Sequence, residues 1–135
     1  QKQESVCLEE AVVMAADLDK AEEIFKRLSA VNEGLSLTRH VVSEPPNVLY
    51  PESMALKALG LTELGIKVEV LGEKDMEKLG MGALLGVGQG SIRESKLVVL
   101  QWLNGGKEGP TVAVVGKGVT FDSGGISIKP SNGME

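Results

Sequence analysis

The sequence contains little of several residue types, and each shortage excludes a class of protein. Cys7 is the only cysteine among 135 residues, so the chain cannot form an internal disulfide, and a cytoplasmic location is expected. Aromatic residues make up 3% of the chain, too few for a surface on which single-stranded nucleic acid stacks. No apolar run is long enough to cross a bilayer, and the polar, acidic residues 1–10 do not resemble a signal peptide. We therefore expect no association with a membrane.

Basic residues are also in the minority. The chain has 14 Lys and Arg against 19 Asp and Glu, a net charge of −5, which disfavours binding to a phosphate backbone. No nucleic-acid partner is therefore expected. A hydrophobic content of 42% over this length indicates one globular domain with a core. Three methionines are predicted to fill gaps in that core: Met76, Met81 and Met134.

The spacing of apolar residues predicts alternating helices and strands. Leu28, Val31 and Leu35 recur at steps of three and four within a long helix predicted over residues 8–43. Prolines at 45 and 46 end this helix, whose length suggests a connector between domains. Beyond it we predict two helices and four strands, over residues 51–64 and 73–79 (helices) and 66–70, 83–87, 97–103 and 111–115 (strands). This order is typical of an α/β fold.

Several weaker signals favour ordinary structural roles. The glycines of residues 86–90 do not have the spacing of a dinucleotide loop, and a strand rather than a helix is expected next. A phosphate loop at Lys117 would require glycine where Thr111 stands and a hydroxyl where Gly118 stands. His40 is expected to pack or face solvent on its helix. The acidic residues 73–77 are expected to form a solvated helix face. Tyr50 offers no short acceptor, so the helix that follows it should fray at its start.

The most informative stretch is residues 116–130, which follows the apolar run of residues 112–115. Lys117 comes directly after the predicted buried strand and should lose hydration there, which frees its amine lone pair. Asp122 can bridge two cations with its two carboxylate oxygens, and the ammonium of Lys129 could stabilise an oxyanion. The alternative is a glycine-rich turn with two surface lysines and an aspartate cap. Spacing alone leaves both interpretations open.

Residues 116–130 closely resemble the signature of the leucyl aminopeptidase family, the PepA-type cytosol aminopeptidases. Three earlier segments resemble that family's sequences in the same order: residues 32–35, 44–49 and 79–91. The resemblance implies an α/β fold with a long N-terminal linking helix, followed by the first part of a mixed β-sheet flanked by helices. It assigns residues 1–44 to the linking helix and residues 45–135 to the N-terminal portion of a truncated catalytic domain.

The resemblance also implies a chemistry. It makes Lys117 and Asp122 metal ligands and Lys129 the catalytic lysine that polarises the scissile carbonyl. Two divalent ions, Mn²⁺ or Zn²⁺, would hold the hydroxide that attacks the peptide bond and would anchor the free amine of the substrate. The family removes N-terminal residues, with a leucine-type preference, and assembles as a homohexamer in the cytoplasm. A bicarbonate ion is a further cofactor in the family, and its site lies beyond this chain.

The resemblance suggests that the 135 residues are an internal fragment of such an enzyme. Two protein ligands do not complete a metal site, so we expect the isolated chain to be inactive. We also expect it to expose apolar surface and to associate. The alternative function is a non-catalytic α/β scaffold or binding module that retains the fold without the chemistry.

Overall fold

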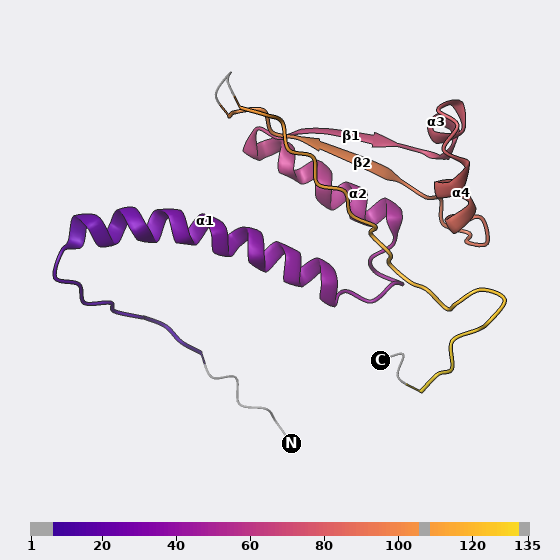
Figure 1. The fold of residues 1–135 in the computed structure, drawn as a ribbon. Coiled ribbons are helices and arrows are strands. Elements are labelled where there is room, and N and C mark those ends of the chain that lie inside the picture. Colours follow the sequence, from indigo (N-terminus) through magenta and orange to yellow (C-terminus); the bar gives the residue numbers. More distant parts are fainter. Residues whose placement is uncertain (1–6, 106–108, 133–135) are drawn as a thin grey trace. The chain divides into compact units, whose positions relative to one another are not determined.

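The computed structural model describes residues 7–105 and 109–132. They contain four α-helices, a short 3₁₀ helix and two strands, in the order α1, α2, η1, β1, α3, α4, β2 (Figure 1). Contacts divide the chain into two compact units, Gln1–His40 and Val41–Glu135. The α/β class is confirmed, with a long helix near the N-terminus, a small sheet and flanking helices. The assignment of residues 1–44 and 45–135 to two domains stays a prediction.

Helix α1, Leu18–Ser43, confirms the predicted long helix but begins ten residues later than expected. Asp17 starts it, because its carboxylate oxygen Oδ1 accepts a 3.1 Å hydrogen bond from the backbone N–H of Lys20. Residues 8–16 have no regular structure and are exposed. Their apolar side chains have no face to pack on within the described residues, and helical propensity alone seldom holds a short helix.

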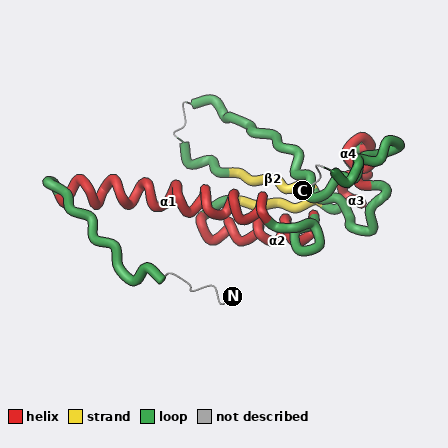
Figure 2. Tube along the Cα trace, turned by 90° about the horizontal axis from the view of Figure 1, so that it is seen from below, coloured by secondary structure: helices red, strands yellow, loops and turns green. Residues whose placement is uncertain are grey.

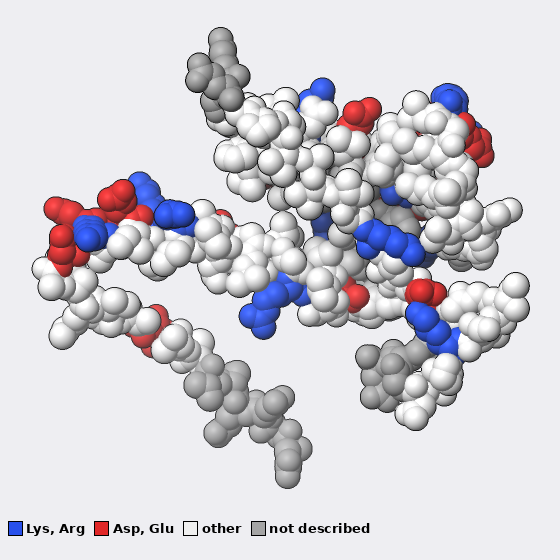
Figure 3. Space-filling model, in the orientation of Figure 1, with Lys and Arg blue, Asp and Glu red and all other residues white. Residues whose placement is uncertain are grey.

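The surface of α1 is charged near its N-terminal end (Figure 3). Four charged residues of its first turns line a shallow hollow there: Asp19, Glu22, Glu23 and Lys26. The predicted apolar stripe is present on this helix, but Phe25, Leu28 and Val31 are 72%, 58% and 62% exposed. Neither α1 nor any other helix among the described residues is both long and apolar enough to span a bilayer.

Helix α2, Pro51–Leu59, continues into the 3₁₀ helix η1, Gly60–Leu64, as predicted over residues 51–64. As expected, the side chain of Tyr50 makes no capping hydrogen bond at the start of this helix. The hydroxyl of Ser53 accepts a 2.9 Å hydrogen bond from the backbone N–H of Tyr50 and contacts the carbonyl of Val48 at 2.9 Å. The expected fraying was inferred from Tyr50 alone and overlooked Ser53, the residue three positions later that supplies the hydrogen bond.

Strands β1, Lys67–Leu71, and β2, Leu97–Gln101, form an antiparallel pair that runs from Lys67↔Gln101 to Leu71↔Leu97. Both were predicted. Helix α2 contacts both strands, and α3, Glu73–Lys78, contacts β1 and α4, Gly82–Gly88. Helices α3 and α4 lie together at one end of the sheet in both views of the backbone (Figure 1, Figure 2). The small core contains Leu49, Ala55 and the fully buried Met76. Met76 confirms its predicted role, Met81 is half-buried, and Met134 lies outside the described residues.

Residues 83–87 were predicted as a strand and belong instead to helix α4, Gly82–Gly88. The less exposed positions are 81, 84, 85 and 88, which is the spacing of a helix face. Alternation cannot decide between a strand and a helix for so short an apolar run. The turn after Gly80, whose φ is 71°, directs this segment against α3.

Residues 111–115 were predicted as a buried strand, and this prediction is also wrong. They have no regular structure, and Val112, Val114 and Val115 are 81%, 92% and 95% exposed. A strand exists only where its backbone N–H and C=O groups pair with a neighbour. Within the described residues the only ladder of paired strands is β1–β2, so this apolar run has no partner.

Candidate functional site

The candidate site is built on a tight turn at Asp122. The backbone N–H of Gly124 donates a 2.9 Å hydrogen bond to Oδ1 of Asp122, two residues earlier. Aspartate favours such turns because its short side chain can replace a backbone acceptor. Gly124 has a φ of 99°, a conformation that residues with a Cβ rarely adopt. A Cβ at this position would also collide with the carbonyl oxygen of Ser127. Both observations explain why glycine stands here.

The chain then folds back on itself. The backbone N–H of Lys129 donates to the carbonyl of Ser123 at 2.9 Å, and Gly125 N–H donates to Ser127 at 3.3 Å. Gly124 and Ile128 form an isolated antiparallel bridge. This narrow loop, residues 122–129, places the start of the Lys129 side chain beside Asp122 although seven positions separate them.

The loop brings the predicted catalytic lysine and the predicted ligand into direct contact. Lys129 Nζ lies 3.0 Å from Oδ2 of Asp122, and each side chain is 48% exposed. The Gly124 N–H holds the pKa of the Asp122 carboxyl below its ordinary value. The hydrogen bond and charge of Lys129 lower this pKa further, and the charge of Lys117 adds to the effect. The carboxylate of Asp122 is therefore ionised at neutral pH and oriented by two donors.

Lys117 is placed differently from what the sequence suggested. Its charge is the smallest of the effects that lower the pKa of the Asp122 carboxyl. The side chain is exposed, however, because the run of residues 112–115 before it is not buried. The expected loss of hydration is thus absent. The backbone carbonyl of Lys117 accepts a 3.1 Å hydrogen bond from Val119 N–H, two residues later.

The donor types fit a divalent cation in part. An amine nitrogen from Lys117 and carboxylate oxygens from Asp122 are ligands that zinc accepts, and manganese prefers the oxygens. Their number falls short, since a protein zinc site commonly has three or four protein ligands. Among residues 7–105 and 109–132, no group of three or more His, Cys, Asp or Glu side chains could hold a metal ion. Lys117 and Asp122 can therefore contribute to a metal site but do not complete one.

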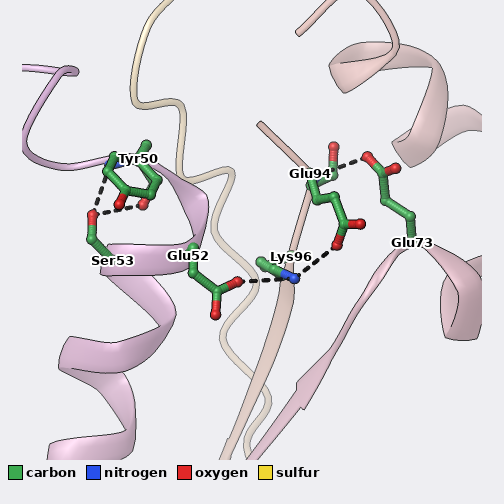
Figure 4. A network of polar contacts seen from close by, with 7 residues as sticks. Tyr50, Glu52, Ser53, Glu73, Glu94 and Lys96 are labelled. Atoms are coloured by element: carbon green, nitrogen blue, oxygen red, sulfur yellow. Dashed lines mark hydrogen bonds and ion pairs between the residues drawn. The ribbon is translucent and has the colours of Figure 1, made fainter. Parts of the chain in front are cut away.

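A second polar group, centred on Lys96, was missed by the sequence analysis (Figure 4). Lys96 Nζ lies 2.9 Å from a carboxylate oxygen of Glu52 and 3.0 Å from one of Glu94, and its side chain is only 15% exposed. These hydrogen bonds, that of Glu52 first, raise the pKa of Lys96 although its partial burial opposes them. The group joins the start of β2 to the first turn of α2. Sequence spacing could suggest the contact with Glu94, but not the contact with Glu52.

The Lys96 group borders a pocket of about 250 Å³. The guanidinium carbon of Arg93 lies 3.9 Å from the centre of the Tyr50 ring, a cation–π arrangement on the pocket wall. Nearby, the backbone N–H of Ser95 donates to Oε1 of Glu73 at 2.9 Å. Glu73 is half-buried, so the expectation of a purely solvated acidic face over residues 73–77 is wrong for this residue. These contacts tie β2 to α2 and α3.

Comparison with known proteins places this sequence in a family. Residues 36–135 match the model of the cytosol aminopeptidase family, catalytic domain. Proteins named "Probable cytosol aminopeptidase" are similar over nearly the whole chain. That of Caulobacter vibrioides is 53% identical over 124 residues, and that of Nitrobacter winogradskyi is 56% identical over 124 residues. Each alignment covers 91% of this chain and 25% of the relative.

A third relative with the same name, from a Bradyrhizobium species, is 53% identical over 136 residues, covering 99% of this chain and 27% of its own length. No solved structure matches the chain. The chain thus spans about a quarter of the length of the curated relatives it matches. A match to the family model over most of the chain, together with identities above one half, gives one conclusion: the chain belongs to the cytosol aminopeptidase family.

Proposed function

We propose that the protein is a di-metal aminopeptidase that releases N-terminal amino acids, with a leucine-type preference, from peptides. Membership of the cytosol aminopeptidase family is the observation that carries this proposal. The contact between Lys129 and Asp122 supports it, because it gathers a cationic and an anionic side chain on one narrow loop. The family name of the relatives supports a peptide as the substrate class.

Each of the three residues has a proposed role. Lys117, through its amine, and Asp122, through its carboxylate, would hold metal together with ligands from outside the described residues. Two Mn²⁺ or Zn²⁺ ions, when bound, would supply a nucleophilic water and an anchor for the substrate's free amine. Lys129 donates its ammonium hydrogens to the scissile carbonyl oxygen and stabilises the negative charge that develops there. The Gly124 N–H keeps the Asp122 carboxylate oriented throughout.

The proposal extends to the setting of the enzyme. The relatives are named for the cytosol, and we propose that this protein works in the cytoplasm as a homohexamer. Native mass spectrometry of the whole protein measures the assembly directly, and a monomer at micromolar concentration would contradict it. The 135 residues alone offer two proposed metal ligands, so the isolated chain is expected to be inactive.

The deciding experiment measures hydrolysis of leucine p-nitroanilide by the whole protein. Activity is expected to disappear when a chelator removes divalent ions and to return with Mn²⁺ or Zn²⁺. Lys129→Gln should lower kcat by about 10²- to 10³-fold, the effect of removing one oxyanion donor. Asp122→Asn should abolish the metal-dependent activity.

Lys78→Gln is the matched control. Lys78 is also paired with an aspartate, Asp75, at 3.2 Å, but it lies on α3, outside the candidate site. Its substitution should leave kcat unchanged. An enzyme that retains full activity after Lys129→Gln or after complete removal of metal would refute the proposed function. Absence of activity from the wild-type protein would instead favour the non-catalytic scaffold.

A further inference from the structure

The pocket beside Lys96 has charges of both signs and an apolar wall. Its volume is about 250 Å³, and six side chains line it: Tyr50, Glu52, Ile92, Arg93, Glu94 and Lys96. None of these residues has a part in the proposed hydrolysis. Their chemistry indicates which class of molecule the pocket can bind.

Arg93 brings a cation without an acidic partner to this pocket. Its guanidinium carbon lies 3.9 Å from the centre of the Tyr50 ring, and this contact leaves N–H donors of the guanidinium available. No carboxylate among the described residues forms an ion pair with Arg93. The guanidinium can therefore hold the carboxylate of a ligand through two parallel hydrogen bonds.

The carboxylates around Lys96 provide an excess of negative charge (Figure 4). Lys96 Nζ lies 2.9 Å from Oε2 of Glu52 and 3.0 Å from Oε2 of Glu94, so one ammonium pairs with two carboxylates. The three groups together keep one negative charge. Each glutamate uses only Oε2 in these contacts, and the two side chains are 54% and 63% exposed. Their Oε1 atoms can therefore accept hydrogen bonds from the ammonium of a ligand.

We propose that this pocket binds a free α-amino acid with an apolar side chain. Arg93 holds the carboxylate of the amino acid, and Glu52 and Glu94 hold its ammonium. Ile92, which is 99% exposed on the pocket wall, packs against the apolar side chain. The four ionic groups of the pocket sum to zero charge, which complements a zwitterion better than a simple anion or cation. Such an amino acid is also the product of the proposed function, so the pocket is a product-binding site outside residues 116–130.

Methyl NMR of the whole protein with labelled isoleucine tests binding at this pocket directly. Ile92 is the local reporter, and its signal is identified by its loss in Ile92→Val. Titration with L-leucine in the presence of a chelator should shift this signal with a Kd of about 1 mM, the scale for a small ligand with few contacts. The signal of Ile24, on α1, should not move. An unmoved Ile92 signal, or equal shifts at Ile24 and Ile92, would overturn the proposal.

Ligand analogues and variants test the two charges separately. Leucine amide lacks the carboxylate and 4-methylpentanoate lacks the ammonium, so each should bind about tenfold more weakly than leucine. Arg93→Gln should weaken leucine binding by a similar factor, whereas Arg39→Gln, at an exposed arginine of α1, should not. Glu94→Gln should weaken binding of leucine but not of 4-methylpentanoate. Unchanged leucine binding by Arg93→Gln would overturn the assigned ligand class.

The titration measures binding and not hydrolysis, so its result is separate from that of the proposed function. A shift of the Ile92 signal in a protein that does not hydrolyse leucine p-nitroanilide supports the pocket and refutes the proposed function. Hydrolysis by a protein whose Ile92 signal does not move supports the function and overturns the pocket.

Discussion

The backbone N–H of Ser95 donates a 2.9 Å hydrogen bond to Oε1 of Glu73, and the two residues are 22 positions apart in sequence. This bond joins the residue that begins α3 to the segment that leads into β2. Its donor is a backbone group and its acceptor a carboxylate, both half-buried. Loss of the acceptor would leave the N–H without its partner.

Glu73→Ala is therefore expected to lower the free energy of unfolding by about 1.5–3 kcal/mol, the usual range for a hydrogen bond to a charged group. Glu77→Ala is the matched control, since Glu77 is an exposed carboxylate on the same helix. Its effect should stay within about 0.5 kcal/mol. Chemical denaturation of the whole protein measures both, and equal effects would show that the bond to Ser95 contributes nothing.

The ion pairs of Lys96 should make stability depend on pH in the alkaline range. Glu52 and Glu94 raise the pKa of Lys96 above its ordinary value of 10.5. A raised pKa means that the folded protein holds this proton more tightly than the unfolded chain. The stabilisation is complete below pH 10.5 and declines as pH rises through the folded-state pKa.

Lys96→Met should consequently lower the free energy of unfolding at pH 8 by about 0.5–1 kcal/mol. The loss is small because both carboxylates are more than half exposed, so that solvent screens the ion pairs. The difference in unfolding free energy between the wild-type and variant proteins should shrink above pH 10.5. Thermal unfolding across pH 8–12 measures it. A difference that stays constant over this range would contradict the role of these ion pairs.

Gly124→Ala should disrupt the Asp122 loop, whereas Gly125→Ala should not. A Cβ at Gly124 would meet the backbone of Ser127, Ile128 and Lys129, and the φ of 99° adds strain of about 1–2 kcal/mol. A Cβ at Gly125 meets nothing within 4 Å. Leucine p-nitroanilide hydrolysis by the two variants should differ by at least about tenfold. Equal activity would indicate that the loop does not position Lys129.

Met76→Ala should be the most damaging of these substitutions for stability. Met76 has no exposed surface. Its truncation should lower the free energy of unfolding by about 2–5 kcal/mol, because it leaves a cavity and removes buried apolar surface. Leu79→Ala is the control, because Leu79 follows the same helix and is 60% exposed. Its cost should be below about 1 kcal/mol. Similar costs in denaturation experiments would mean that Met76 is not a core residue.

Local sequence signals predicted most of the secondary structure. Pro45 ended α1 and Gly80 ended α3. The alternation in residues 66–70 predicted β1, and the apolar run in residues 97–103 predicted β2. The wrong predictions concern segments whose conformation depends on contacts with other parts of the chain. Residues 83–87 are too short a run for periodicity to distinguish a helix from a strand. Residues 111–115 have strand-like composition, but a strand also needs a partner, which the described residues do not supply.

The candidate site was predictable only in part. The motif at residues 116–130 identified Lys117, Asp122 and Lys129, and the loop brings Asp122 and Lys129 into contact. The exposure of Lys117 was not predictable from its position, because the expected burial depended on a strand at residues 111–115 that does not form. The contact between Lys96 and Glu52 joins positions far apart in sequence, which no local spacing reveals.

The pairing of Leu71 with Leu97 has a consequence for the order of folding. Pairing of these two residues closes a loop that contains residues 72–96. The first hydrogen bond between β1 and β2 must therefore offset the loss of conformational entropy when this loop closes. The backbone amides of the two strands cannot become protected from hydrogen exchange separately, since each strand provides the hydrogen-bond acceptors for the other. Amide hydrogens of Val70 and Val98 should accordingly slow their exchange with solvent in the same kinetic step, after α3 and α4 have begun to compact.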